Sequence, residues 1–117
     1  MMTPLPSEYS AFWKLWEKGE YFECHEVLEI AWRREQNPER KQFFQGLIHC
    51  AVALVHVERQ HPIGARGQLR KAQAKLERFG AEYSGCDILA VLGFVEKSVT
   101  LIESRILVLA LELGNKP

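Results

Sequence analysis

The feature that most constrains this fold is an uncharged run of fifteen residues in the middle of the chain, from Phe43 to Val57. Projected at about 100° per residue, its apolar side chains cover two neighbouring flanks of a helix. The third flank is polar and carries Gln42, Gln45, His49, His56 and Gln60. A helix that is apolar around most of its circumference is usually buried in a bundle. We therefore expect the other helices to pack around residues 43–60, and the polar flank to need hydrogen-bond partners or water.

Turn and capping signals divide the rest of the chain into helices. They predict helices over residues 7–18, 21–36, 37–60, 63–79, 88–92 and 94–113. Ser7, Asn37 and Asp87 are the expected N-caps, and Gly93 is expected to break or bend the chain. No stretch alternates with a period of two, so no sheet is expected. The predicted fold is all-α: a bundle of about five to six helices, formed by two antiparallel helical hairpins that are weakly repeat-like, plus a C-terminal helix.

Length and composition limit the possible classes of protein. A chain of 117 residues predicts one helical domain over residues 1–117, with residues 1–6 as a flexible N-terminal segment. Fifteen basic residues balance fifteen acidic ones, and no Lys or Arg run exceeds two residues, so no nucleic-acid partner is expected. The chain shows neither a secretory signal nor the roughly 20 apolar residues of a membrane span. These features predict a cytoplasmic location and no membrane partner.

The three cysteines, Cys24, Cys50 and Cys86, are odd in number, widely spaced and surrounded by apolar residues. A disulfide framework or a metal site of the Cys-x-x-Cys type would show a different spacing. We expect three small, buried thiols.

A candidate site follows from the positions of the histidines. On the second predicted helix, His25 lies on the apolar face and Glu29 follows one turn later; on the central helix, Gln45 and His49 are one turn apart and His56 lies two turns further on. Consecutive helices joined by a short turn run antiparallel, so these groups can converge. Imidazole and carboxylate groups that meet between helices can hold a divalent metal ion or act as general acid and base. The metal candidates are His25, Glu29, His49 and His56, and the candidate catalytic pair is His25 and Glu29.

A purely structural role is the alternative for each of these residues. His25 can be a core histidine that Glu29 orients, Gln45 can satisfy a buried polar group, and His49 can be a half-exposed polar residue. The chain has no His-Glu-x-x-His motif and no pair of Glu-x-x-His motifs. The metal interpretation therefore depends on tertiary contact between helices.

Two segments carry a resemblance to a known family. The run from Gly19 to Trp32, GEYFECHEVLEIAW, followed by FQGLI at residues 44–48 and by Gly64-Ala65, resembles the domain-of-unknown-function 309 family of small all-helical bacterial and archaeal proteins. The resemblance covers roughly residues 12–87 and implies a helical fold without an established activity; some members are labelled metal-dependent hydrolases. The family pattern falls on Glu23, His25, Glu26, Leu28, Glu29, Trp32, Gln45, Gly46, His56, Gly64 and Ala65. This sequence departs from the family pattern at His49 and at Gln60-His61.

Two functions from different classes follow. The first is a helical binding or interaction protein whose buried pocket, formed by His25, Glu26, Glu29, Gln45 and His56, holds a metal or a small polar ligand. The second is a hydrolase, assisted by a metal or by a His/Glu general base, although the chain offers no nucleophile motif and no phosphate-binding loop. The stretch from Ile106 to Leu111 is apolar on nearly all sides, which predicts a homo-oligomer, most simply a dimer, that pairs through the C-terminal helix.

Overall fold

The computed structural model describes residues 3–114 and the side chains of residues 3–112. These residues form five α-helices: α1 (Ser7–Glu17), α2 (Tyr21–Arg34), α3 (Pro38–Glu58), α4 (Pro62–Leu76) and α5 (Ile88–Gly114). A short 3-10 helix, η1 (Glu77–Phe79), and two two-residue strands, β1 (Glu82–Tyr83) and β2 (Cys86–Asp87), connect α4 to α5. The predicted all-α fold class is confirmed.

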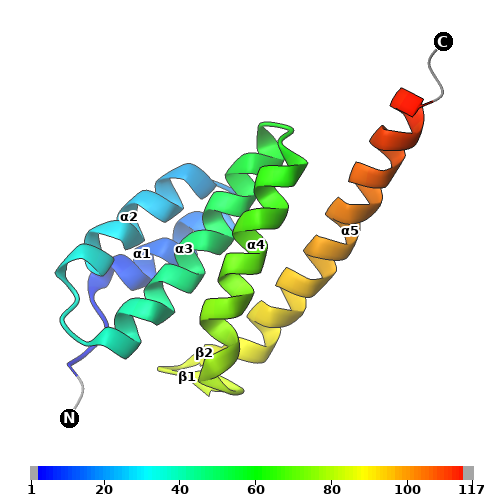
Figure 1. Cartoon of the computed structure of the whole chain (residues 1–117). Coiled ribbons are helices and arrows are strands. Elements are labelled where there is room, and N and C mark those ends of the chain that lie inside the picture. The colour runs from blue at the N-terminus through cyan, green and yellow to red at the C-terminus, as the bar shows by residue number, and fades with distance from the viewer. Residues whose placement is uncertain (1–2, 115–117) are drawn as a thin grey trace.

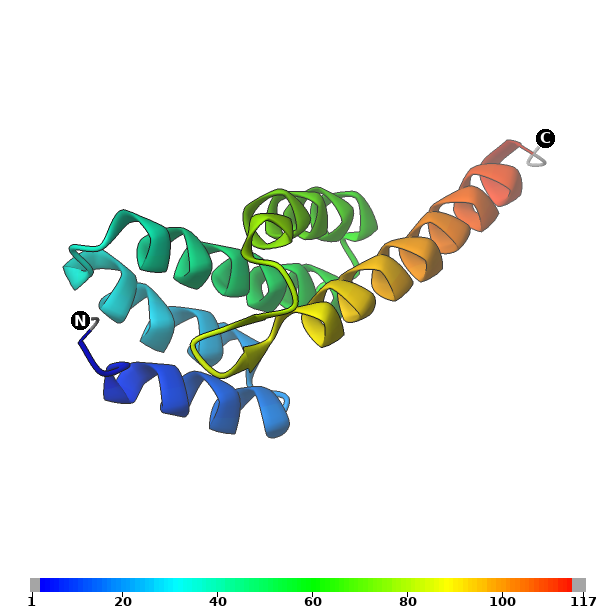
Figure 2. The ribbon, with the colours of Figure 1, turned by 90° about the horizontal axis from the view of Figure 1, so that it is seen from below.

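The main contacts between helices join neighbours in the chain, α1 with α2, α2 with α3, α3 with α4, and α4 with α5, and the contact between α3 and α4 is the most extensive. Figure 1 shows this succession, and Figure 2, seen from below, shows α1 to α4 as neighbouring rods. In both views the C-terminal half of α5 diverges from the other helices. No helix among residues 3–114 is both long enough and apolar enough to cross a membrane.

The core is centred on α3, as the uncharged run predicts. Phe43, Phe44 and Leu47 are completely buried, and they join one cluster with Phe12 of α1 and Leu28 of α2. The polar flank of α3 is half-buried from Gln42 to His56, and α3 ends at Glu58, so Gln60, the last residue of the predicted flank, lies exposed beyond the helix. The central helix is therefore packed on most sides, while its polar flank lies at the edge of the core.

Two glycines bring α3 and α4 close together. A Cβ on Gly46 would lie 2.6 Å from Cγ of the buried Leu76, and one on Gly64 would lie 2.7 Å from Nδ1 of His56. Real Cβ atoms essentially never make contacts under 3.0 Å, so these positions accept no side chain without movement of a neighbour. Four residues of the family pattern, Gly46, His56, Gly64 and the buried Ala65, therefore lie on or beside the contact between these two helices.

The segment before α5 differs from the sequence prediction, which expected no sheet. Glu82 pairs with Asp87 and Tyr83 with Cys86 in an antiparallel hairpin. The turn residues Ser84 and Gly85 have φ of 49° and 80°, which matches the two positive φ angles of a type I′ turn. Two-residue strands are too short to produce an alternating pattern, so the sequence does not indicate them.

The predicted break at Gly93 is also wrong, because α5 is continuous from Ile88 to Gly114. A glycine inside a helix costs only about 1 kcal/mol relative to alanine. Ile88, Val95 and Val99 are buried on one face of α5, before and after the glycine. Packing of that face on the bundle outweighs the cost.

The helix caps follow the sequence in two of three cases. The Asn37 side chain accepts a hydrogen bond from Arg40 N at 3.0 Å, and Asp87 Oδ1 accepts one from Ala90 N at 2.9 Å. Ser7 is the first helical residue rather than the N-cap, which is Pro6. The second helix ends at Arg34, two residues before the predicted end, and the last three residues predicted for the fourth helix form η1.

The N-terminal segment is held against α3 by a buried arginine. Arg40 is the only charged residue that is buried among those described, and its guanidinium donates to the hydroxyl and the carbonyl of Thr3, at 3.0 and 2.6 Å. A Glu35 carboxylate oxygen lies 3.4 Å from the same group. Residues 1 and 2 lie outside the described residues.

Candidate functional site

The predicted pair on α2 is present, but it interacts within its own helix. Nδ1 of His25 lies 2.5 Å from the carbonyl oxygen of Phe22, and its Nε2 lies 4.0 Å from Oε2 of Glu29. The other carboxylate oxygen of Glu29 accepts a hydrogen bond from Arg33 at 2.5 Å. Both side chains are partly exposed, at 18% for His25 and 33% for Glu29, while Glu26 is exposed. An arginine already neutralises the carboxylate of this pair.

The histidines of α3 face α4. Nδ1 of His49 lies 2.8 Å from Oε1 of Gln68 on α4, and burial lowers the pKa of His49, so its ring stays neutral at neutral pH. The ring of His56 lies against Gly64 and 6.0 Å from the ring of His61. Its Nδ1 atom is buried and has no hydrogen-bond partner among the described residues.

The hydrogen bonds and ion pairs of these residues therefore have different partners: those of His25 and Glu29 lie on α2, and that of His49 lies on α4. Gln45 lies on α3, as His49 does, and is half-buried. No three His, Cys, Asp or Glu side chains in the described part of the chain are grouped so that they could hold a metal ion. The polar pocket and its metal stay a prediction from the sequence.

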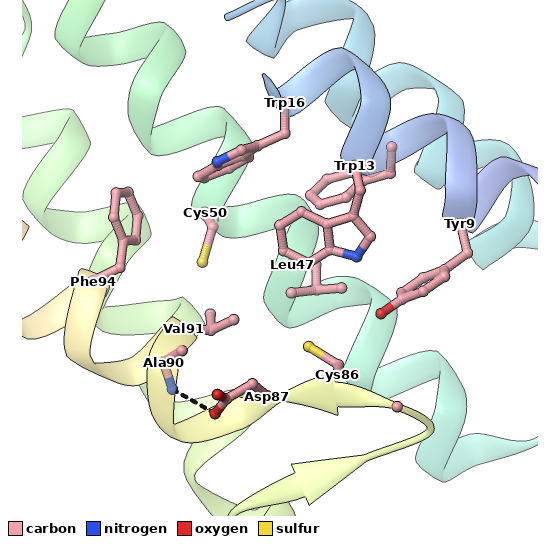
Figure 3. A pocket seen from close by; sticks show the side chains of 12 residues that line it. Tyr9, Trp13, Trp16, Leu47, Cys50, Cys86, Asp87, Ala90, Val91 and Phe94 are labelled. Atoms are coloured by element: carbon pink, nitrogen blue, oxygen red, sulfur yellow. Dashed lines mark hydrogen bonds between the residues drawn. The ribbon is translucent and has the colours of Figure 1, made fainter. Parts of the chain in front are cut away.

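A different feature forms a defined cavity, which we call the aromatic pocket. It has a volume of about 510 Å³ and lies between α1, the middle of α3, β2 and the first turns of α5 (Figure 3). Its walls are mostly apolar, and four of its rings come from α1 and α5: Tyr9, Trp13, Trp16 and Phe94. Cys50 and Cys86, with Val91, line it as well, and Figure 3 shows these three side chains between the rings and β2.

The polar groups of the aromatic pocket are neutral except for one. Burial raises the pKa of Cys50 to about 12 and also raises the pKa of Cys86, so both thiols stay protonated at neutral pH. Burial likewise raises the pKa of Tyr9 to about 12. Asp87, which caps α5, is the only charged residue among those that line the pocket in the described chain.

Reasoning from the sequence missed this pocket, although one signal for it was present. Tyr9, Trp13 and Trp16 recur at i, i+4 and i+7, which places three large rings on one face of a helix of only eleven residues. All three are only partly buried, whereas Phe12 beside them is completely buried. The other walls come from α3 and from residues 85–94, which approach α1 only through tertiary packing.

Comparison with known proteins places the chain among proteins of unknown function. The family model described as Domain of unknown function (DUF309) matches residues 9–68. The uncharacterized protein YpuF of Bacillus subtilis (strain 168) is 47% identical over 47 residues, which are 40% of this chain and 27% of that protein. An uncharacterized protein of Aquifex aeolicus (strain VF5) is 24% identical over 102 residues, which are 87% of this chain and 28% of that protein.

The chain thus matches less than a third of the length of either relative. No solved structure matches it. The matched family region contains the polar residues from His25 to His56 and the α1 wall of the aromatic pocket, whereas the wall formed by residues 85–94 lies beyond it.

Proposed function

This chain belongs to the domain-of-unknown-function family DUF309, and we propose that it is a binding module whose site is the aromatic pocket. In this proposal it holds an apolar ligand or the apolar part of one and does not chemically convert it. The observation that carries the proposal is the pocket itself, a cavity of about 510 Å³ whose rings are only partly covered by the protein.

The dimensions and chemistry of the aromatic pocket support this role. Ligand sites typically measure about 300–1,000 Å³ and combine apolar walls with few polar groups. Burial of apolar surface stabilises a protein by on the order of 25 cal/mol per Å². The exposed parts of Trp13 and Trp16 do not contribute this free energy. A ligand that covers these rings would recover that free energy. The neutral thiols and phenol offer no activated nucleophile, which favours binding over catalysis.

The polar pocket of His25, Glu26, Glu29, Gln45 and His56, with a metal or a small polar ligand, was predicted from the sequence as the binding site. The proposal moves the site to the aromatic pocket, because the hydrogen bonds of His25 and Glu29 are made within α2. Hydrolase activity likewise stays a prediction from the sequence.

A fluorescent probe tests the proposal. N-phenyl-1-naphthylamine is uncharged and brightens in apolar surroundings, so it should bind the native chain with saturable fluorescence. Ala90 lines the aromatic pocket and is itself exposed on α5. Ala90→Trp should fill the pocket and abolish the saturable signal. The matched control is Ala74→Trp, at an exposed alanine of α4 outside the pocket; it should bind the probe as the parent does. Equal binding by both variants would contradict the proposal.

We also propose that two copies associate weakly through the distal half of α5. Leu101, Ser104, Val108 and Leu111 recur at spacings of three, four and three, and all four side chains are exposed. This spacing is that of a helix–helix seam. If two such helices pair antiparallel with Leu101 of one copy opposite Leu111 of the other, Ser104 lies opposite Val108, and the apolar side chains of the two seams meet.

The size of this seam sets the expected strength of association. From residue 101 to residue 111 it is about 15 Å long and about 10–12 Å wide, on the order of 170 Å² per copy. Stable interfaces bury about 800 Å² per partner. We therefore expect a concentration-dependent dimer rather than an obligate one.

Sedimentation equilibrium over a wide range of concentration tests this association. Leu101→Lys should remove it, because it places a charge in the seam. Leu89→Lys is the matched control, since Leu89 is 61% exposed on the same helix, against 63% for Leu101, and lies outside the seam. A chain that stays monomeric at about millimolar concentration, where even an association of about 4 kcal/mol would be detected, would contradict the proposal.

A further inference from the structure

We propose that the ligand of the aromatic pocket is a small alkylated ammonium ion, a cation whose nitrogen is surrounded by methyl or methylene groups. This inference rests on the proposed function, because it names the ligand class of the same pocket. Three observations carry it: the arrangement of the rings, the single carboxylate, and the scarcity of other groups that could solvate a bare ion.

The rings form a row along the aromatic pocket, each in edge-to-face contact with the next. Along the row from Tyr9 to Trp13, Trp16 and Phe94, neighbouring ring centroids are 6.4, 5.8 and 5.4 Å apart, and neighbouring planes meet at 85°, 65° and 75°. Figure 3 shows Trp16, from α1, and Phe94, from α5, with differently oriented planes. The face of an aromatic ring is the negative part of its quadrupole and attracts a cation within about 6 Å of the centroid.

The charge of the aromatic pocket favours a cation. Its described lining includes the Asp87 carboxylate and contains no Lys, Arg or His. Asp87 uses Oδ1 to cap α5 through Ala90 N, and its negative charge also offsets the positive end of that helix. An anionic ligand would meet this carboxylate without a basic partner.

The apolar lining favours an alkylated cation over a metal ion or a bare ammonium ion. A strongly hydrated ion must exchange its water for hydrogen-bond acceptors or ligands, and its burial is costly otherwise. Here the remaining walls are apolar side chains such as Leu47 and Val91, and the two thiols are protonated. Thiols bind metals as thiolates. An ammonium ion whose nitrogen is surrounded by alkyl groups is weakly hydrated, and its alkyl groups can pack against these apolar side chains.

The experiment compares two molecules of the same shape. Choline carries a trimethylated nitrogen, and 3,3-dimethylbutan-1-ol has carbon in place of that nitrogen and no charge. Both are titrated into the full chain at constant ionic strength, with intrinsic tryptophan fluorescence as the readout; Trp32→Phe leaves only Trp13 and Trp16 to contribute to it. We expect choline to bind about five- to thirtyfold more tightly, the range of a partly to fully desolvated cation–π contact.

Asp87→Asn removes the negative charge of the aromatic pocket but keeps the N-cap of α5, because asparagine is as good an N-cap as aspartate. It should weaken choline binding several-fold and leave the binding of the uncharged alcohol unchanged. The matched control is Glu96→Gln, which removes a charge from an exposed position of α5 outside the aromatic pocket; it should change neither.

The outcomes distinguish this inference from the proposal on which it rests. If the alcohol binds as tightly as choline, or if Asp87→Asn leaves choline binding unchanged, the ammonium assignment is overturned while the pocket remains a binding site. If neither molecule binds but the naphthylamine probe does, the assignment is overturned in the same way. If Ala90→Trp affects the binding of none of the three, both the ligand class and the proposed function are overturned.

Discussion

Replacing Gly46 by alanine tests the close contact between α3 and α4, on which the position of the polar flank depends. The added Cβ would lie 2.6 Å from both Cγ and Cδ2 of Leu76, where ordinary contacts begin near 3.4 Å. Leu76 is completely buried, so its side chain cannot turn into solvent. Overpacking of this kind costs about 1–3 kcal/mol. Against this, alanine is favoured over glycine inside a helix by about 1 kcal/mol.

Gly93 provides the matched reference. It also lies inside a helix, but a Cβ there would meet no atom within 4 Å. Gly93→Ala should therefore stabilise the protein by about 0.5–1 kcal/mol. Because the gain in helix propensity is common to both variants, the difference between their free energies of unfolding isolates the contact with Leu76, at about 1–3 kcal/mol.

Urea unfolding followed by circular dichroism measures this difference. With a slope of about 1–3 kcal/mol per molar urea, the two midpoints should differ by roughly 1 M. Leu76→Val, which shortens the opposing side chain, should cost less in the Gly46→Ala background than in the parent. A Gly46→Ala variant as stable as Gly93→Ala would refute the close approach of the two helices.

Three further predictions concern single groups. Because burial raises the pKa of Cys24 and Cys50 to about 12 and also raises that of Cys86, a thiol reagent at pH 8 should label none of them rapidly until urea unfolds the chain; rapid labelling of the folded protein would contradict their burial. Burial lowers the pKa of His49, so as the pH falls below the unfolded value of about 6.5, the unfolded chain takes up the proton first and stability falls. Stability should therefore decline less between about pH 7 and pH 5 in His49→Gln than in the parent, and equal slopes in urea titrations would exclude this contribution. Asp87→Ala should cost about 1 kcal/mol through loss of the α5 cap, and Asp87→Asn only a few tenths; thermal melts compare them, and equal losses would show that the hydrogen bond to Ala90 does not stabilise the helix.

The parts of the fold that depend on local signals could be predicted from the sequence. The uncharged run of α3, the Asn37-Pro38 start of that helix and the Asp87 cap of α5 each follow from a few neighbouring residues, and all three occur. Gly93 shows the limit of such signals. Its local preference opposes a helix, but burial of Val95 and Val99 after it decides the outcome.

The candidate site could be predicted less well, because a site depends on which helix faces which. Helical phase predicts His25 on the apolar face and His49 on the polar flank; His25 is partly exposed, at 18%, and the phase does not give the partners of either residue. His49 forms a hydrogen bond with Gln68 of α4 rather than with a group of α2. The aromatic pocket needs residues 85–94 to return to α1, through a hairpin and a continuous α5 that the sequence did not indicate.

The most direct test of the central claim follows the three tryptophan side chains by NMR. Trp13 and Trp16 line the aromatic pocket, whereas Trp32 lies on α2 with the ammonium group of Lys41 4.5 Å from its ring centroid. Each indole N–H gives one signal, which a Trp→Phe variant assigns. On titration with 3,3-dimethylbutan-1-ol, the signals of Trp13 and Trp16 should shift to saturation while that of Trp32 stays in place. If the first two stay unmoved, or if Trp32 shifts as far as they do, the aromatic pocket is not the binding site.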